Sequence, residues 1–404
     1  MRINDSRRNF LKIAGVAGSL PLLSSRLVFA QSVPQPRDVL VVIFQRGGMD
    51  GLNVVVPHGD GDYYDRRGTV AIAPDDVIAL PGETRFGLHP SLDSLLPLYQ
   101  AGELALVHAV GGPTRNRSHF SCQDLMERAV FDGSGVPSGW LNRHLVSRGA
   151  ASEFQGVGMG TAVPRSLSGT APVLGISTFD DFAVQSTSPR ADELSATLNL
   201  LHPDAGGLDA VARSAFSAMA ALESADPGQY ESTNGAVYPA TPFGRQLQQV
   251  AQLIKAGVGL EVATVDIGGW DHHDDELNRL APLLEEFGRG LAAFRADLGA
   301  AMAGVSLVSM SEFGRRVVPN ASGGTDHGTA NCMFVLGGGV VGGKVHADWP
   351  GLASADLVEG DLAITTDYRA VLGELLRKRR GETALPDVFP GYADPLEVGL
   401  FRQA

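Results

Sequence analysis

The stretch Asp38-Val39-Leu40-Val41-Val42-Ile43-Phe44 is the strongest indication of fold class in this chain of 404 residues. It is almost continuously apolar and rich in β-branched side chains, which is typical of a central strand with both faces buried. A glycine-rich polar run follows at once, Gln45-Arg46-Gly47-Gly48-Met49-Asp50-Gly51-Leu52-Asn53. In α/β proteins, ligands bind beyond the carboxyl ends of such strands. The stretch therefore predicts an α/β fold with a ligand site at the carboxyl end of this strand.

Strand-like and helix-like segments alternate along the rest of the chain. Further strands are expected at 104–110, 260–267, 305–310 and 332–336, and helices at 92–104, 118–130, 243–255, 275–302 and 368–379. This alternation predicts a mostly parallel sheet with helices on both faces. The region from about 133 to 240 has a weaker pattern and is rich in Ser, Gly, Ala and Pro, so we expect an inserted lid or cap there.

The N-terminus carries a targeting signature. Ser6-Arg7-Arg8-Asn9-Phe10-Leu11-Lys12 is a twin-arginine motif, and Val28-Phe29-Ala30 offers a cleavage site after a mildly apolar run. That run is shorter than the roughly 20 residues of a membrane span, which disfavours an anchor. We therefore predict a signal peptide over 1–30, a single domain over 31–404, and a periplasmic or secreted protein with no stable membrane insertion after cleavage.

The charge of the chain excludes some partners. The net charge is −13, and removing residues 1–30, which carry +4, leaves −17. Such an acidic protein is a poor candidate for binding nucleic acid or anionic lipid, where cationic patches supply the affinity. The two cysteines, Cys122 and Cys332, leave open whether a disulfide forms. The sequence does not indicate the oligomeric state.

Polar clusters follow the expected strands at their carboxyl ends. They are Gly111 to His119, Gly268 to Asp274 and Ser311 to Arg316. The pair Asp326-His327 differs, because it precedes the strand at 332–336, so we expect it to reach the site as a loop. An adjacent carboxylate and imidazole both need polar partners near a core, and a divalent metal would satisfy both. This pair is the clearest candidate for a metal site.

Five segments carry a resemblance to a known family. RGGMDGLNVVVP, RSHFSCQD, GGWDHH, SEFGRR and ASGGTDHGTAN resemble, in the same order, segments of the bacterial family called domain of unknown function 1501. The resemblance covers essentially the whole mature chain and implies an alkaline-phosphatase-like fold, near the alkaline phosphatase and sulfatase superfamily. It further implies an exported metal-dependent hydrolase of phosphate or sulfate esters, acting on a small-molecule or polymer-borne anionic ester.

The superfamily mechanism implies roles for individual residues. Asp271, His273 and His327 would form one metal site, and Asp50, Glu312 and Asp326 a second. Ser118 would be the nucleophile at a helix N-terminus, with Arg115, Arg117 and Arg315 binding the substrate oxygens. The mixture of imidazoles and carboxylates suits zinc or manganese, with one or two ions in each chain.

Each role has an alternative. Ser118 can be an ordinary helix N-cap, and His119 beside it can be a ligand or a packed side chain. Asp50 can cap a glycine turn, and Glu312 can pair with a neighbouring arginine. Neither cysteine lies in the Cys-x-Pro/Ala-x-Arg pattern of formylglycine sulfatases, which disfavours that class. A noncatalytic exported protein that binds a ligand or partner in the same cleft is therefore the alternative function.

Overall fold

A mixed sheet forms the centre of the protein. The computed structural model describes residues 38–149, 154–179, 230–392 and 397–403. Within these residues nine strands form one sheet in the order β11-β5-β10-β9-β1-β8-β6-β7, with β12 also paired to β5. The strands are β1 (Val39–Arg46), β5 (Leu104–Gly111), β6 (Gly156–Met159), β7 (Leu174–Ile176), β8 (Val262–Gly268), β9 (Val305–Met310), β10 (Asn331–Gly337), β11 (Lys344–His346) and β12 (Thr366–Asp367).

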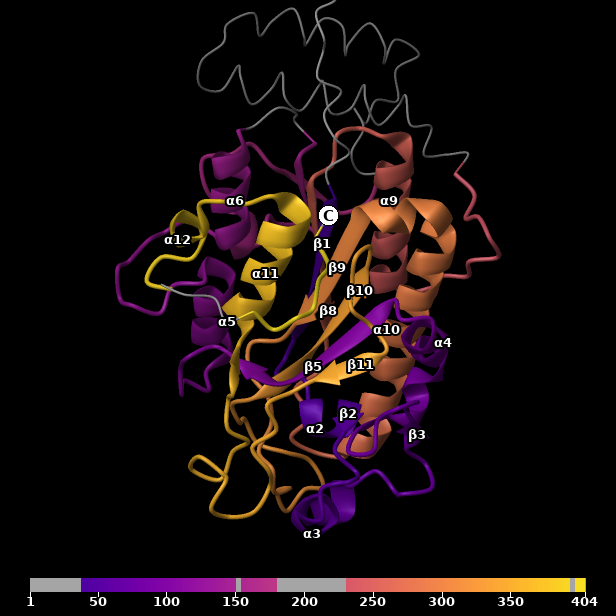
Figure 1. The fold of residues 1–404 in the computed structure, drawn as a ribbon, viewed down its shortest axis with the longest axis vertical. Coiled ribbons are helices and arrows are strands. Elements are labelled where there is room, and N and C mark those ends of the chain that lie inside the picture. Colours follow the sequence, from indigo (N-terminus) through magenta and orange to yellow (C-terminus); the bar gives the residue numbers. More distant parts are fainter. Residues whose placement is uncertain (1–37, 150–153, 180–229, 393–396, 404) are drawn as a thin grey trace, which may run out of the picture. The chain divides into compact units, whose positions relative to one another are not determined.

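Helices cover both faces of this sheet, as Figure 1 shows. On one face pack α4 (Leu96–Gln100), α9 (Pro242–Ala256) and α10 (Glu276–Leu298), and on the other α5 (His119–Arg128), α6 (Trp140–Arg148), α11 (Tyr368–Arg380) and α12 (Leu385–Val388). Alternate residues of β1 supply the two cores, because successive side chains of a strand point to opposite faces. Val41 and Ile43 join Phe287 in one core, while Leu40 and Val42 join Leu372 in the other. The predicted mostly parallel sheet flanked by helices is confirmed.

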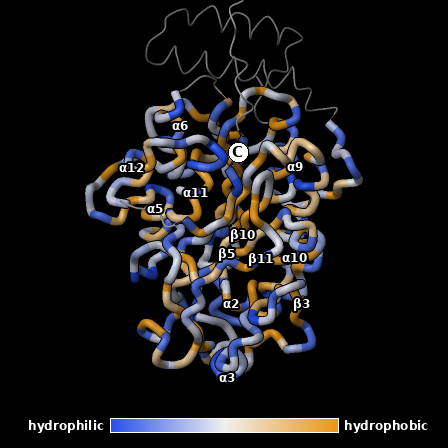
Figure 2. The backbone as a smooth tube through the Cα atoms, viewed as in Figure 1, coloured by the Kyte–Doolittle hydropathy of each residue, from blue (hydrophilic) through white to orange (hydrophobic). Residues whose placement is uncertain are grey.

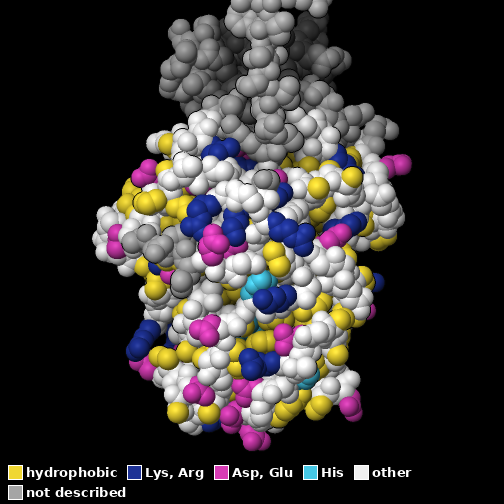
Figure 3. Space-filling model, in the orientation of Figure 1, with side chains coloured by type: hydrophobic (Ala, Val, Ile, Leu, Met, Phe, Trp, Pro, Cys, Tyr) yellow, Lys and Arg dark blue, Asp and Glu magenta, His cyan; other side chains and the backbone are white. Residues whose placement is uncertain are grey.

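Smaller elements complete the described chain. They are α2 (Gly51–Val54), α3 (Asp62–Arg67), and a second sheet in the order β2 (Val55–Val56), β4 (Gly87–Leu88), β3 (Ile78–Ala79), with 3-10 helices at Gly68–Val70, Pro90–Leu95, Arg165–Leu167 and Gly299–Gly304. Apolar segments concentrate along the central strands in Figure 2. On the face drawn in Figure 3, acidic and basic side chains are interspersed.

Two predicted helices end earlier than expected. The segment predicted as one helix over 92–104 is a 3-10 helix followed by α4, which ends at Gln100, because the chain turns at Gly102 with a φ of 71°. The long helix predicted to reach 302 ends at Leu298, where Gly299 takes a φ of 52° and a 3-10 turn follows. Glycine adopts these backbone angles without the clash that a Cβ would cause, so both helices stop there.

Part of the region predicted as an insertion belongs to the central sheet. Strands β6 and β7 fall within the range 133–240, and both pair in parallel register beside β8. Their sequences are short and contain Gly156, Gly158 and Gly175, so they lack a strong apolar pattern. The remainder of the range, at 180–229, and the predicted signal peptide at 1–30 lie outside the described residues. Among the described residues, no helix is long and apolar enough to cross a membrane.

The direction of β10 is the feature that assembles the site. In the described sheet β10 runs antiparallel to both of its neighbours, β5 and β9, whereas the other pairs are parallel. Its first residue, Asn331, therefore lies at the edge where β1, β5, β8 and β9 end. The turn before β10 thus reaches the same edge as the clusters that follow the other strands.

Candidate metal centre

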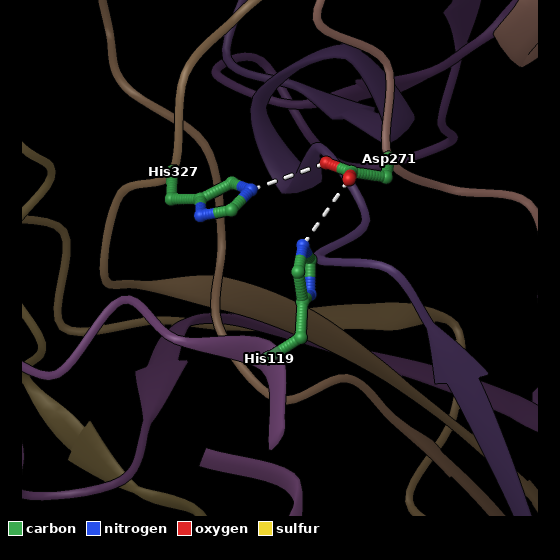
Figure 4. Close-up of side chains that lie close together, drawn as sticks. All are labelled: His119, Asp271 and His327. Atoms are coloured by element: carbon green, nitrogen blue, oxygen red, sulfur yellow. Dashed lines mark hydrogen bonds and ion pairs between the residues drawn. The ribbon is translucent and has the colours of Figure 1, made fainter. Parts of the chain in front are cut away.

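His119, Asp271 and His327 meet at this edge of the sheet, as Figure 4 shows. One ligand atom from each of the three residues lies within 4.8 Å of the other two. His327 Nε2 is 3.1 Å from Asp271 Oδ1, and His119 Nε2 is 3.3 Å from Asp271 Oδ2. His119 Nε2 is buried and forms no hydrogen bond to the described chain. The carboxylate of Asp271 thus lies between two imidazoles.

Each of the three residues comes from a different connection. His119 is the first residue of α5, reached from the end of β5. Asp271 follows β8 after Gly269 and Trp270, and His327 precedes β10 in a loop that pairs with Arg315 through a single antiparallel bridge. Asp271 and His327 are 56 positions apart and His119 is more than 150 positions from both, so the three meet because their strands share one edge.

Two glycines permit the close approach of these loops. A Cβ on Gly47 would lie 2.8 Å from the amide nitrogen of Asp271, and the φ of Gly47 is 126°. A Cβ on Gly328 would lie 2.4 Å from the backbone of Arg315. Both distances are shorter than real Cβ contacts, so a side chain at either position would displace a loop that carries a site residue.

His273 and Asp326 extend the group. His273 Nε2 is 3.0 Å from Asp271 Oδ1 and 3.0 Å from His327 Nε2. The other ring nitrogen of His273 is 3.1 Å from Asp326 Oδ1. Asp326 therefore touches the group through His273 and does not itself reach Asp271.

The Nδ1 atoms of the three histidines all face hydrogen-bond acceptors. Nδ1 of His119 is 2.7 Å from Glu312 Oε1, and Nδ1 of His327 is 2.8 Å from the carbonyl oxygen of Arg117. Nδ1 of His273 faces the Asp326 carboxylate. A carbonyl or carboxylate oxygen can only accept, so each Nδ1 carries its hydrogen, and each neutral ring presents a lone pair at Nε2. Three imidazole lone pairs and a carboxylate therefore converge.

The carboxylates of this group favour their charged forms. Burial would raise the pKa of Asp271, but the hydrogen bond and the positive charge of Arg315 lower it to about 2. Burial also works against Glu312, whose pKa is nevertheless lowered by hydrogen bonds from His119 and Gln123. Because both carboxylates are charged at neutral pH, the group has an excess of negative charge and lone pairs that favours a cation.

Histidine and carboxylate donors of this kind fit a divalent transition metal. Zinc is commonly bound by histidine nitrogens together with an aspartate or glutamate oxygen. Histidine ligands typically donate their second N–H to a carboxylate or backbone carbonyl, and all three rings here do so. The donor set of His119, Asp271 and His327, with His273 beside it, is therefore a possible metal-binding group.

Glu312 and Arg315 position this group by contacting His119 and Asp271, respectively. Glu312 accepts hydrogen bonds from the Gly47 amide at 2.9 Å and from Gln123 Nε2 at 2.9 Å, in addition to its contact with His119. The buried Arg315 donates to Asp271 Oδ1 at 2.7 Å, and its remaining donors bind backbone carbonyls of the surrounding loops. Arg315 is therefore occupied by the protein rather than facing a substrate.

The structure does not bring Asp50 to this group. Its side chain is buried, accepts from the Leu52 amide at 3.2 Å and forms an ion pair with the buried Arg67. Arg67 also pairs with Glu276 at 3.2 Å. Burial raises the pKa of Glu276 well above its usual range, whereas the pKa of Asp50 is lowered by Arg67 against the effect of burial. Asp50 is thus part of a buried ion network.

Ser118 and the two loop arginines lie beside the group. Ser118 is the exposed N-cap residue of α5, and its hydroxyl makes no capping hydrogen bond. Arg117 pairs with the buried Asp361, and Arg115 pairs with Glu359 at 2.6 Å. The Arg115 pair is exposed on both sides, so an anionic ligand could compete with it at little cost in free energy.

The sequence left open whether His119 is a ligand or a packed side chain, and the structure places its ring beside Asp271. Its signal is its position, because it directly follows Ser118 at the start of a helix that begins beyond a strand end. Cys122 and Cys332 are both buried free thiols, so they form no disulfide with each other.

Comparisons by sequence identify a family. The family model described as protein of unknown function (DUF1501) matches residues 110–372, which is more than half of the chain. The matched range contains every residue of the candidate metal centre. No match was found among curated proteins.

Comparisons by structure give distant likenesses. The C-terminal periplasmic domain of EptC from Escherichia coli, in complex with Zn, is 10% identical over 75% of this chain and 73% of its own, with a TM-score of 0.34. The lipoteichoic acid synthase LtaP from Listeria monocytogenes is 8% identical over 82% of this chain and 75% of its own, with a TM-score of 0.37. The sulfatase PsFucS1 from Pseudoalteromonas sp. is 11% identical over 91% of this chain and 70% of its own, with a TM-score of 0.36. Likeness at this level identifies no activity.

Proposed function

The chain belongs to the DUF1501 family, and we propose that it is an exported metal-dependent hydrolase of phosphate or sulfate esters. The observation that carries the proposal is the convergence of imidazole lone pairs on Asp271. With Nδ1 protonated in His273 and His327, two lone pairs face each other across 3.0 Å. Such a contact is repulsive unless one of the two nitrogens is also protonated or a metal cation lies between or beside them. A divalent ion satisfies His119, Asp271 and His327 together.

A bound divalent ion would supply Lewis-acid chemistry, polarising a phosphoryl or sulfuryl oxygen and favouring deprotonation of a hydroxyl nucleophile. The protein residues supply position and charge. Asp271 contributes a permanent negative charge, and Glu312 orients His119 through its Nδ1 hydrogen. Arg315 keeps Asp271 in place, since its guanidinium contacts both the carboxylate and the loops on either side.

Ser118 is the proposed nucleophile. It stands at the N-terminus of the ten-residue helix α5, where backbone N–H groups favour a tetrahedral anion. Its Oγ would form a bond to phosphorus or sulfur while the bond to the ester oxygen breaks, and the hydroxyl proton would end on the departing alcohol. Water would then hydrolyse the seryl ester and regenerate Ser118.

The openness of the site favours large as well as small esters. The side chains of Asp271 and His273 are 46% and 42% exposed, and those of His119 and His327 are 21–23% exposed. Arg115, which is 67% exposed, and Arg117 offer guanidinium groups to the oxygens of an anionic ester. A polymer-borne phosphate or sulfate could therefore reach the metal centre without passing through a narrow channel.

The test is turnover of a panel of phosphate and sulfate monoesters by protein loaded with zinc or manganese. We expect hydrolysis that is lost in Asp271→Asn and reduced by orders of magnitude in Ser118→Ala, with both variants folded. Gln249→Leu, which alters a helix residue outside the candidate metal centre, serves as the control. Metal binding without turnover of any ester would favour the alternative, a noncatalytic exported binding protein.

Export is a separate part of the proposal and rests on the motif at 6–12. We expect the chain to reach the periplasm or the medium through twin-arginine translocation. Replacing Arg7 and Arg8 together by lysine should retain the protein in the cytoplasm, as measured by cell fractionation. Unchanged export of that double variant would contradict the assignment.

A further inference from the structure

A cavity lies at the same edge of the sheet as the metal centre. It has a volume of about 450 Å³ and is bordered by the end of β6, by the segment after β7, and by Thr264 and Asp266 of β8. Strand β8 therefore leads to both sites: Asp266 lines the cavity, and Asp271, five residues later, belongs to the metal centre. Since β6, β7 and β8 run parallel, this cavity also lies at a carboxyl edge, where α/β proteins bind ligands.

Five of the nine described residues that line the cavity have polar side chains, and four of these are uncharged, while Met159, Ala162 and Pro164 are apolar. Hydroxyl groups come from Thr161, Thr264 and Ser177, and an amide comes from Gln246 of α9. None of the described residues that line it is aromatic or basic. The Oε1 atom of Gln246 is buried and accepts no hydrogen bond within the described chain. A buried acceptor without a donor is unfavourable by about 1–3 kcal/mol, and a ligand hydroxyl would remove that penalty.

The charges around the cavity exclude an anionic occupant. Asp266 is the charged group of the lining, and its carboxylate pairs with Arg46 Nε at 2.6 Å. Arg46 in turn pairs with Glu127 at 3.1 Å, so its positive charge is balanced twice. Among the described lining residues, an anion would meet a carboxylate and no free cation. A ligand with several neutral hydroxyl groups matches the hydroxyl, amide and carboxylate partners instead.

A chain of hydrogen bonds joins this cavity to the metal centre. Asp266 binds Arg46, and Arg46 Nη1 donates to Gln123 Oε1 at 3.1 Å. Gln123 Nε2 donates to Glu312 at 2.9 Å, and Glu312 is 2.7 Å from Nδ1 of His119. Three side chains thus separate the cavity wall from the histidine. A substrate that occupies both places therefore has to extend past these three side chains.

We propose that this cavity is a subsite for the polyhydroxy alcohol part of the substrate, a neutral sugar or polyol unit. The proposal names the class of alcohol in the ester and rests on the proposed hydrolase for its role in catalysis. Binding of the alcohol itself does not require the metal centre, so the two can be tested apart.

The experiment measures binding of neutral monosaccharides to the Asp271→Asn protein. D-glucose, D-galactose and D-mannose are titrated in saturation-transfer NMR, with 4-nitrophenol as an aromatic comparator. We expect at least one sugar to bind, and Thr264→Val and Gln246→Leu each to weaken it about tenfold, which corresponds to the loss of one buried hydrogen bond. Gln249→Leu is the matched control, because Gln249 lies on the same helix with a buried Oε1 that also lacks a donor, and it does not line the cavity.

Three results would overturn the proposal. They are the absence of binding by all three sugars, equal weakening in Gln249→Leu, and tighter binding of 4-nitrophenol than of any sugar. Thr264 and Gln246 lie on different elements, so misfolding of one variant leaves the other informative, and the first result needs no cavity variant. Sugar binding in a protein that hydrolyses no ester would refute the hydrolase and keep the subsite.

Discussion

His273 and His327 face each other through their Nε2 atoms at 3.0 Å, with Asp271 Oδ1 within 3.1 Å of both. The opposite nitrogen of each ring is held by an acceptor, the Asp326 carboxylate for one and the Arg117 carbonyl for the other. Neutral rings with this hydrogen-bond pattern direct two lone pairs at each other and at a carboxylate. The arrangement is stable only with a positive charge among the three atoms, and this is why a metal ion fits here.

Asp271→Asn should abolish the stabilisation of the fold by zinc. In the metal-free protein, the variant loses the charged carboxylate that pairs with the buried Arg315, so we expect the melting temperature to fall. In wild type, zinc at a hundred times its Kd should stabilise the fold by about 2.7 kcal/mol, and this gain should vanish in the variant. Thermal melts with and without zinc measure both effects. An equal zinc-induced rise in both proteins would contradict the role of Asp271.

Glu312→Gln should weaken metal binding without removing a ligand. Glu312 holds the Nδ1 hydrogen of His119, and loss of such an outer carboxylate typically weakens metal affinity about 10–100-fold. Competition with a zinc-chelating dye measures the affinity. Glu285→Gln, on an exposed ion pair with Arg289, is the matched control and should leave the affinity unchanged. Unchanged affinity in Glu312→Gln would show that His119 does not bind the metal.

Arg67→Met should destabilise the fold strongly. Arg67 is fully buried between Asp50 and Glu276, and its removal leaves carboxyl groups in the core without a cation. Breaking a buried ion pair from one side reduces the free energy of unfolding by about 3–5 kcal/mol. Arg289→Met removes an exposed ion pair and should change it by less than about 1 kcal/mol. Urea unfolding of the two variants gives the comparison, and similar values for both would argue against the buried network.

Glu382 should contribute acid-sensitive stability. Burial alone would raise its pKa, but hydrogen bonds from His144, Ser147 and the Ala384 amide outweigh burial and lower the pKa from 4.5 to about 2. The unfolded chain therefore binds this proton more tightly than the folded one. The stabilisation is complete above about pH 4.5 and is lost as the pH falls toward about 2.

Glu382→Gln removes this dependence. We expect the variant to be less stable by about 1–3 kcal/mol at neutral pH, and its urea midpoint to fall less than that of wild type between about pH 5 and pH 3. Glu285→Gln again serves as the exposed control. A midpoint that falls as steeply in Glu382→Gln as in wild type would place the acid sensitivity elsewhere.

Much of the fold could be predicted from apolar patterning. The strand at 38–44 is continuously apolar after Asp38, the strand at 305–310 is apolar except for Ser306 and Ser309, and both lie at the centre of the sheet. Strands β6 and β7 escaped prediction, because they are short and contain glycine, and pairing with β8 rather than their own pattern makes them strands. The helix predicted over 92–104 was wrong in extent, because glycine at 102 ends it early.

The site could be predicted only in part. Asp271, His273 and His327 stand out in glycine-rich turns, and the structure brings them together. The apolar pattern of the sequence does not show the direction of a strand. Strand β10 is antiparallel to β9, so the turn before β10 reaches the edge at which the other strands end. Burial was missing as well, since the ion pair of Asp50 with Arg67 and the carbonyl contacts of Arg315 are visible only in the folded chain.

Zinc stoichiometry tests the central claim most directly. Natively exported protein, purified without chelating resin, is dialysed against zinc, and its metal content is measured by inductively coupled plasma mass spectrometry beside that of Asp271→Asn. A divalent ion held by His119, Asp271 and His327 predicts at least one zinc per chain in wild type and loss of that zinc in the variant. Wild-type protein that takes up no metal, or a variant that retains the full amount, would contradict the metal centre.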